Sequence, residues 1–200
     1  MKWSHGMNKK LKTKDYISLA LYAALYIALY FISVAICSLF GSMAHSFSTA
    51  LQGLIAGPLI YFVAHKIGKM WQFTVFSAIY MAIFTLMGSG YLPWLITTMV
   101  GAVIADLLVS KNNNPSTLKL GFASGIMVMA CQWGQTIPVW FFLDKFKEEW
   151  IARGVSPADM ELMVAGSQGM MGVLSSVACI VGGIAGIYLG HAILKKHLKR

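Results

Sequence analysis

Residues 9–39 read KKLKTKDYISLALYAALYIALYFISVAICSL, and this stretch indicates the kind of fold that the chain adopts. Four lysines precede an apolar run over residues 16–39. A helix needs about 20 such residues to cross the hydrocarbon of a bilayer. The run is too long for the core of a signal peptide, and no A-x-A cleavage site follows it. We therefore expect a first membrane span that is retained.

Five further apolar runs follow, over residues 47–65, 71–87, 92–109, 118–143 and 166–194. The chain is 58% hydrophobic and 12% charged, whereas a soluble domain carries about 25% charged residues. These runs predict an all-α polytopic membrane protein, a six-transmembrane-helix bundle. No linker is long enough to separate a second domain, so residues 1–200 are expected to form a single membrane domain.

The charges divide the connections into two kinds. Thirteen of the sixteen Lys and Arg residues lie near the two termini or after the second and fourth runs, and five of the seven acids lie within residues 144–161. Positively charged loops stay in the cytoplasm, so both termini are predicted inside (N-in/C-in) and residues 144–161 outside. The net charge of +9 then reflects topology and contact with anionic membrane lipids, and no nucleic-acid partner is expected.

The outer connection has its own pattern. Phe146, Trp150 and Ile151 make it amphipathic enough for a short helix at the membrane interface. Gly154 and Pro157 are expected to break that helix.

Several polar and aromatic residues converge in depth on the outer half of the bundle. Aromatic walls with a few placed hydrogen-bonding groups are typical of a small-molecule pocket. The alternatives are an interfacial aromatic belt for the aromatic residues and hydrogen bonds between helices for the glutamines. The predicted substrate-binding residues are Trp133, Gln135, Gln132, Gln168, Trp94, Tyr91 and His45.

Small residues form two stripes at helical spacing. Ala20, Ala24 and Ala28 make two overlapping A-x-x-x-A motifs, and the last apolar run carries a glycine-rich seam from Gly169 to Gly190. Small residues on one face let another helix approach closely, either inside the bundle or from a partner subunit. The sequence leaves both readings open for each stripe.

Catalysis has little support in the sequence. The chain has no H-E-x-x-H and no P-loop motif. Gly88-Ser89-Gly90 has a nucleophile-like spacing, but the candidate base His191 is predicted on the other side of the membrane. The three cysteines, Cys37, Cys131 and Cys179, have no metal-site spacing. We expect no enzyme activity, no metal and no cofactor. Asp106, within the fourth run, is expected to form an ion pair.

Size, topology and the position of the alanine motif together resemble the substrate-binding (S) component of energy-coupling factor (ECF) transporters. The opening LKTKDYISLALYAALYIALYF looks most like the Trep_Strep, or MptD-like, subgroup. The resemblance covers essentially the whole chain. It implies that the chain binds a vitamin-like micronutrient near the outer face and docks through Ala20, Ala24 and Ala28 on a transmembrane coupling subunit energised by two ABC ATPase subunits.

The sequence therefore predicts a non-enzymatic substrate-capture component of an ABC-type importer in the cell membrane, expected to be a bacterial plasma membrane. Three other readings stay open. They are a self-contained secondary transporter or channel, a lipid-modifying membrane enzyme, and a structural assembly subunit without a ligand. The residues do not identify the substrate.

Overall fold

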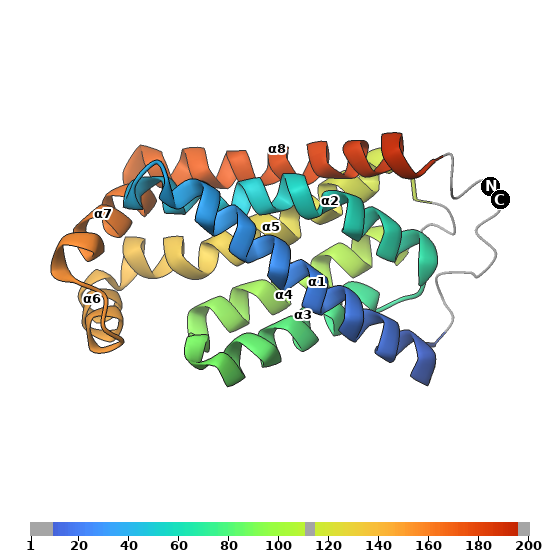
Figure 1. Cartoon of the computed structure of the whole chain (residues 1–200), viewed down its shortest axis with the longest axis horizontal. Coiled ribbons are helices and arrows are strands. Elements are labelled where there is room, and N and C mark those ends of the chain that lie inside the picture. The colour runs from blue at the N-terminus through green and yellow to red at the C-terminus, as the bar shows by residue number, and fades with distance from the viewer. Residues whose placement is uncertain (1–9, 111–114, 196–200) are drawn as a thin grey trace.

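The computed structural model describes residues 10–110 and 115–195, and every regular element in that part of the chain is a helix. The long helices extend along the molecule, and the short helices α6 and α7 lie at one end (Figure 1). In chain order the elements are α1 (Thr13–Ser38), the 3-10 turn η1 (Ser42–Phe47), α2 (Ser48–Lys66), α3 (Gln72–Phe84), the π-turn η2 (Thr85–Ser89), α4 (Leu92–Ser110), α5 (Thr117–Phe141), α6 (Leu143–Ala152), α7 (Pro157–Ser167) and α8 (Gly169–Leu194).

Five helical segments of the described chain are long and apolar enough to cross a membrane. A sixth is obtained if α5 and α6, which are bent by 118° at their junction, count as one span. The prediction of an all-α fold with several membrane spans is thus confirmed, and the structure supports a count of five or six. The apolar segments run over residues 13–38, 43–66, 72–89, 92–109 and 169–194.

The connection between the fifth and sixth apolar runs, which is predicted to lie outside, differs from the single short helix expected there. It contains two helices, α6 and α7, and the chain breaks between them at Gly154, whose φ is +94°. A new helix then begins because Ser156 accepts a hydrogen bond from the Asp159 backbone N–H, and Pro157 occupies the first helical position. The break was predicted correctly, whereas the restart was not.

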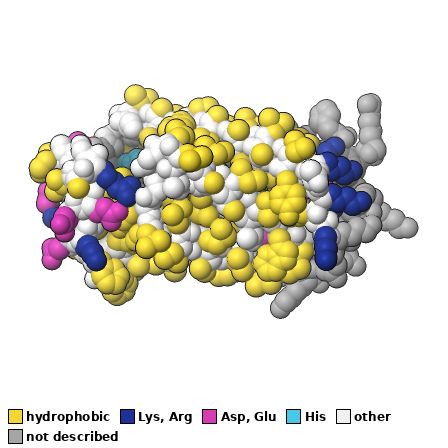
Figure 2. Space-filling model, turned by 90° about the horizontal axis from the view of Figure 1, so that it is seen from below, with side chains coloured by type: hydrophobic (Ala, Val, Ile, Leu, Met, Phe, Trp, Pro, Cys, Tyr) yellow, Lys and Arg dark blue, Asp and Glu magenta, His cyan; other side chains and the backbone are white. Residues whose placement is uncertain are grey.

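Charged side chains gather at the two ends of the molecule and apolar ones cover the surface between them (Figure 2). The end with α6 and α7 carries acidic side chains and a few basic ones, and the opposite end, near α1's first turn, carries Lys side chains. An apolar belt between two charged ends is the surface that a membrane-spanning bundle needs.

The glycine seam of α8 packs inside the bundle. A Cβ on Gly186 would lie 2.2 Å from the Gly53 carbonyl oxygen of α2, and a Cβ on Gly183 would lie 2.6 Å from Gly125 Cα of α5. Such contacts leave no room for any side chain, so these glycines allow the backbones of three helices to touch. Internal packing is therefore the role of this part of the seam.

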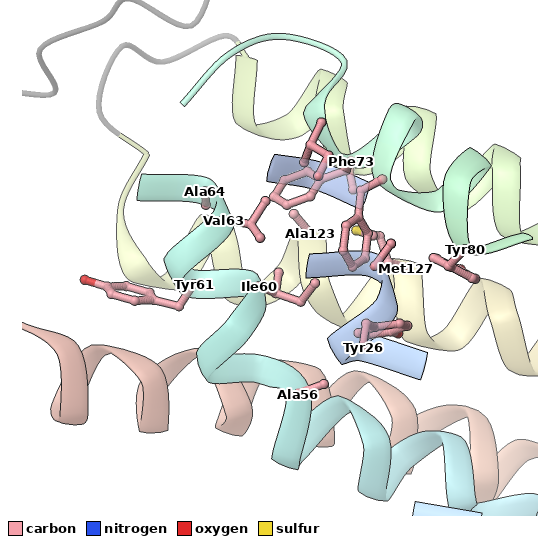
Figure 3. Close-up of a cluster of buried hydrophobic side chains, with 14 of the residues drawn as sticks. Tyr26, Ala56, Ile60, Tyr61, Val63, Ala64, Phe73, Tyr80, Ala123 and Met127 are labelled. Carbon is pink, nitrogen blue, oxygen red and sulfur yellow. The ribbon is translucent and has the colours of Figure 1, made fainter. Parts of the chain in front are cut away.

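A cluster of apolar side chains fills the space between α1, α2, α3 and α5 (Figure 3). Leu19, Phe73 and Phe76 are completely buried in it. Lipid tails are as apolar as these side chains, so the cluster stabilises the bundle by close packing more than by exclusion of water.

Two buried carboxylates anchor the end of the bundle opposite α6 and α7. Asp15, in the first turn of α1, forms a buried ion pair with Lys69 and accepts a hydrogen bond from the Lys12 backbone N–H. Asp106 of α4 accepts hydrogen bonds from the backbone N–H groups of Phe73 and Thr74 at the start of α3, at 3.2 and 2.7 Å.

The partners of Asp106 differ from the ion pair that we expected. Thr74 Oγ1 also donates to this carboxylate, at 2.7 Å, whereas α3 has no side-chain cap of its own. A carboxylate from a neighbouring helix thus satisfies amides that the first turn of a helix leaves unpaired. Among the described residues, the acid that pairs with a buried lysine is Asp15, whose partner is Lys69.

Candidate functional site

A cavity of about 340 Å³ lies between α1, α2, α3, α4 and α5, toward the end of the bundle where α6 and α7 are found. This volume is at the lower end of the range of small-molecule pockets, about 300–1,000 Å³. Its lining combines aromatic and uncharged polar side chains. The lining residues are Tyr26, Tyr30, Phe31, His45, Ser48, Thr49, Gln52, Tyr80, Phe84, Ser89, Tyr91, Trp94, Cys131, Gln132, Gly134, Gln135, Trp150 and Met163.

Helices α1, α3 and α4 supply most of the aromatic lining. The ring centroids of Phe84 and Trp94 are 5.7 Å apart at an interplanar angle of 81°, and those of Tyr80 and Trp94 are 6.3 Å apart. Tyr26 lies 5.2 Å from Tyr80, and Tyr30 packs edge-on against Phe84 at 5.3 Å. These contacts hold the rings in one continuous wall with limited rotamer freedom.

Helices α2 and α5 supply most of the hydrogen-bonding groups. Thr49 Oγ1 donates to Gln132 Oε1 at 3.0 Å. The other end of that amide, Nε2, is buried without a hydrogen-bond partner among the described residues, and Gln132 is only 3% exposed. Gln52, one turn after Thr49 on α2, is 2% exposed. A buried amide donor without a partner costs about 1–3 kcal/mol, which makes Gln132 Nε2 a candidate donor for a bound molecule.

A second glutamine of the cavity lining, Gln135, links α5 to α7. Gln135 Nε2 donates to Ser167 Oγ at 2.9 Å, and Ser167 Oγ lies 3.4 Å from Ser46 Oγ of η1. Trp140 Nε1 donates to the Ser167 carbonyl at 2.9 Å. Ser167 therefore joins α5, η1 and the end of α7 beside the cavity residue Gln135.

Aromatic residues also form the rim toward α6. The rings of Tyr91 and Trp150 are 5.7 Å apart, and the Arg153 guanidinium lies within 6 Å of both ring centroids. Burial raises the pKa of Tyr91 to about 12, Glu149 adds to the rise and Arg153 opposes it. The Tyr91 hydroxyl is thus a neutral group at physiological pH.

Five of the seven predicted substrate-binding residues line this cavity. They are His45, Tyr91, Trp94, Gln132 and Gln135. The sequence thus predicted that aromatic and amide side chains lie together here, and the substrate-binding role of these five residues stays a prediction.

Trp133 and Gln168 lie outside the cavity. Trp133 is 38% exposed, and its indole Nε1 donates to Ser176 Oγ of α8 at 3.0 Å. It follows Gln132 by one residue, which is about 100° around a helix, so the two side chains face different neighbours. Gln168 is exposed and precedes α8 in an extended backbone conformation.

The sequence interpretation missed the aromatic wall. Tyr26 and Tyr30 on α1, and Tyr80 and Phe84 on α3, each lie four residues apart and so share a helix face. Tyrosines far from the ends of apolar runs were a usable signal, because a phenol within the hydrocarbon needs a polar neighbour.

The predicted docking alanines lie on a face of α1 that no other described helix covers. Ala20, Ala24 and Ala28 are all exposed on the outer face of α1, among exposed apolar side chains such as Leu21 and Leu25. The internal neighbours of α1 meet its other face, where Leu19 and Ala23 are completely buried. This stripe is thus available to lipid or to another helix.

Among the described residues, no three His, Cys, Asp or Glu side chains lie close enough together to hold a metal ion.

A family model described as a hypothetical bacterial integral membrane protein (Trep_Strep) matches residues 13–200. No curated protein and no solved structure matches the chain.

Proposed function

The chain belongs to the Trep_Strep family of bacterial integral membrane proteins, and from this premise we propose that it is the substrate-capture (S) component of an ECF-type importer. It binds a small organic micronutrient in the cavity between α1 and α5 and delivers it to an ATP-driven module. The observation that carries this proposal is the cavity itself, where the buried Gln132 amide has a donor that no described residue pairs with.

The distribution of charges between the two ends of the molecule supports transport into the cell. The lysine-rich end is assigned to the cytoplasm and the end with α6 and α7 to the outside, because basic segments stay inside. The cavity then opens in the outer half of the membrane, where a scarce nutrient arrives. The protein itself carries out no chemical step.

The alanine stripe of α1 supplies the docking surface in this proposal. Ala20, Ala24 and Ala28 leave a shallow strip along an exposed helix, and a helix of a transmembrane coupling subunit fits closely against such a strip. Two ABC ATPase subunits then supply the energy, since the described fold has no nucleotide motif of its own.

The experiment is purification of the full chain in mild detergent, followed by mass spectrometry of the small molecules that it releases on denaturation. An S component should release one organic compound in near-stoichiometric amount and rebind it in a calorimetric titration. Failure to retain any compound, even from cells grown in rich medium, would support the reading as an assembly subunit.

A further inference from the structure

The lining of the cavity restricts the charge of its ligand. None of the described lining residues is Asp, Glu, Lys or Arg. Arg153 lies against Tyr91 and Trp150 at the rim, but its guanidinium donates to Glu149 Oε1 at 2.8 Å and to the Gly90 carbonyl at 3.0 Å. A charged group that entered the cavity would lose its water without an opposite charge to replace it. The site therefore favours a neutral molecule.

The aromatic wall of the cavity restricts the shape of the ligand. Tyr26, Tyr80, Phe84 and Trp94 come from three helices and are locked against one another by edge and tilted contacts. Rigid rings of this kind present faces and edges on which a flat ring packs with little gap. The volume of about 340 Å³ is at the lower end of the range for small-molecule pockets and leaves room for such a ring.

Two hydrogen-bond donors without a partner among the described residues restrict which polar groups the ligand carries. Gln132 Nε2 and the indole Nε1 of Trp150 are both buried, and neither has a hydrogen-bond partner among the described residues. Both side chains line the cavity. Thr49 already occupies Gln132 Oε1, so a further hydrogen bond of this amide would be made by its donor end, Nε2. Donors are matched by acceptors, of which a carbonyl oxygen or a ring nitrogen is the commonest kind on a neutral flat molecule.

We propose that this cavity binds a neutral, planar aromatic or heteroaromatic ring that carries a carbonyl acceptor, and that Gln132 Nε2 donates to that carbonyl. This inference rests on the proposed capture function and specifies its substrate class. The ring packs against the wall formed by α1, α3 and α4, and its polar edge faces α2 and α5.

The test uses three probes with one ring system and different charge. They are 2-naphthamide, which is neutral, 2-naphthoate, an anion, and 2-naphthylmethylammonium, a cation. Binding to the full chain in lipid nanodiscs is measured by calorimetry at pH 8, where an imidazole with the ordinary pKa is neutral. Empty nanodiscs give the blank for partition into lipid. Decalin-2-carboxamide, with the same amide on a ring that is not flat, tests the requirement for planarity.

We expect 2-naphthamide to bind at least about tenfold more tightly than either charged probe and than the saturated amide. Gln132→Met keeps the length of the side chain and removes the donor. It should weaken the binding of 2-naphthamide by about tenfold or more, because that is the usual effect of losing one hydrogen bond to a buried ligand. Gln168→Met is the matched control, since Gln168 lies outside the cavity and its change should leave binding as in the wild type.

Three results would overturn the proposal. They are equal or tighter binding of a charged probe, no binding of 2-naphthamide to the wild type, and unchanged binding by a folded Gln132→Met variant. The charge series needs no variant, so it decides the question even if Gln132→Met fails to fold. A charged compound released by the purified protein would reject this substrate class and leave the capture function standing.

Discussion

Thr49 Oγ1 of α2 donates to Gln132 Oε1 of α5 at 3.0 Å, across 83 positions of sequence. This bond fixes the orientation of an amide that would otherwise rotate in the cavity. Its donor end, Nε2, has no hydrogen-bond partner among the described residues. In the proposed function this fixed donor would lower the entropy cost of binding a ligand.

The two tryptophans that the sequence singled out should behave differently. Trp94→Ala removes a ring of the cavity wall, so binding of the compound released by the purified protein should weaken by at least about tenfold, the effect of losing about 1.4 kcal/mol of contact. Trp133→Ala should leave the affinity within about twofold, because Trp133 contacts Ser176 outside the cavity. Calorimetric titration of both variants checks this, and a larger loss in Trp133→Ala would move the site to the α5–α8 side.

The ion pair between Asp15 and Lys69 should dominate the stability of its end of the bundle. Asp15→Asn leaves the Lys69 ammonium buried without its counter-charge, a change that typically costs about 3–5 kcal/mol. Glu161→Gln breaks the exposed pair with Lys147 and should cost at most about 1 kcal/mol. Thermal unfolding in detergent compares the two. Equal midpoints would show that Lys69 finds another partner or reaches water.

Sidedness can be checked with single cysteines in a background where Cys37, Cys131 and Cys179 are replaced by alanine. A cysteine at Lys10 should resist an impermeant thiol reagent in intact cells and react after lysis, because the lysine-rich end is assigned to the cytoplasm. A cysteine at the exposed Glu148 of α6 should react in intact cells. The reverse pattern would invert the proposed topology.

The alanine stripe gives a steric prediction. Ala24→Trp places a large ring on an exposed strip, so the chain should fold normally and lose most of its co-purification with the coupling subunit. Ala35→Trp makes the same change at another exposed position of α1, about 16 Å farther along the helix, and should leave the complex intact. Retention of the complex by a folded Ala24→Trp variant would exclude this face as the docking site.

The sequence predicted the parts of the structure that depend on composition. Apolar runs of about 20 residues and their flanking lysines predicted a helical membrane bundle, because the bilayer imposes length and hydrophobicity on each span. Gln132 and Trp94 were predicted to lie in a pocket because several polar and aromatic groups converge at one depth of the spans, and both line the cavity. These inferences require no knowledge of how the helices pack.

Features that depend on helix rotation and long-range contact were not predictable in this way. Trp133 was placed beside Gln132 by depth, but one residue of helical rotation directs it to Ser176. The ion pair of Asp15 with Lys69 spans 54 positions, and no local pattern identifies it. Ser167 joins Gln135 to α7 only because α7 folds back over the bundle end.

Uptake into proteoliposomes tests the central claim most directly. The compound released by the purified protein is radiolabelled and offered to vesicles that contain either the chain alone or the chain with its coupling subunit and two ATPases. The proposed function predicts ATP-dependent accumulation only in vesicles with the complete module, and its loss with Gln132→Met but not with Gln168→Met. Accumulation or flux through the chain alone would contradict the account and identify a self-contained transporter or channel.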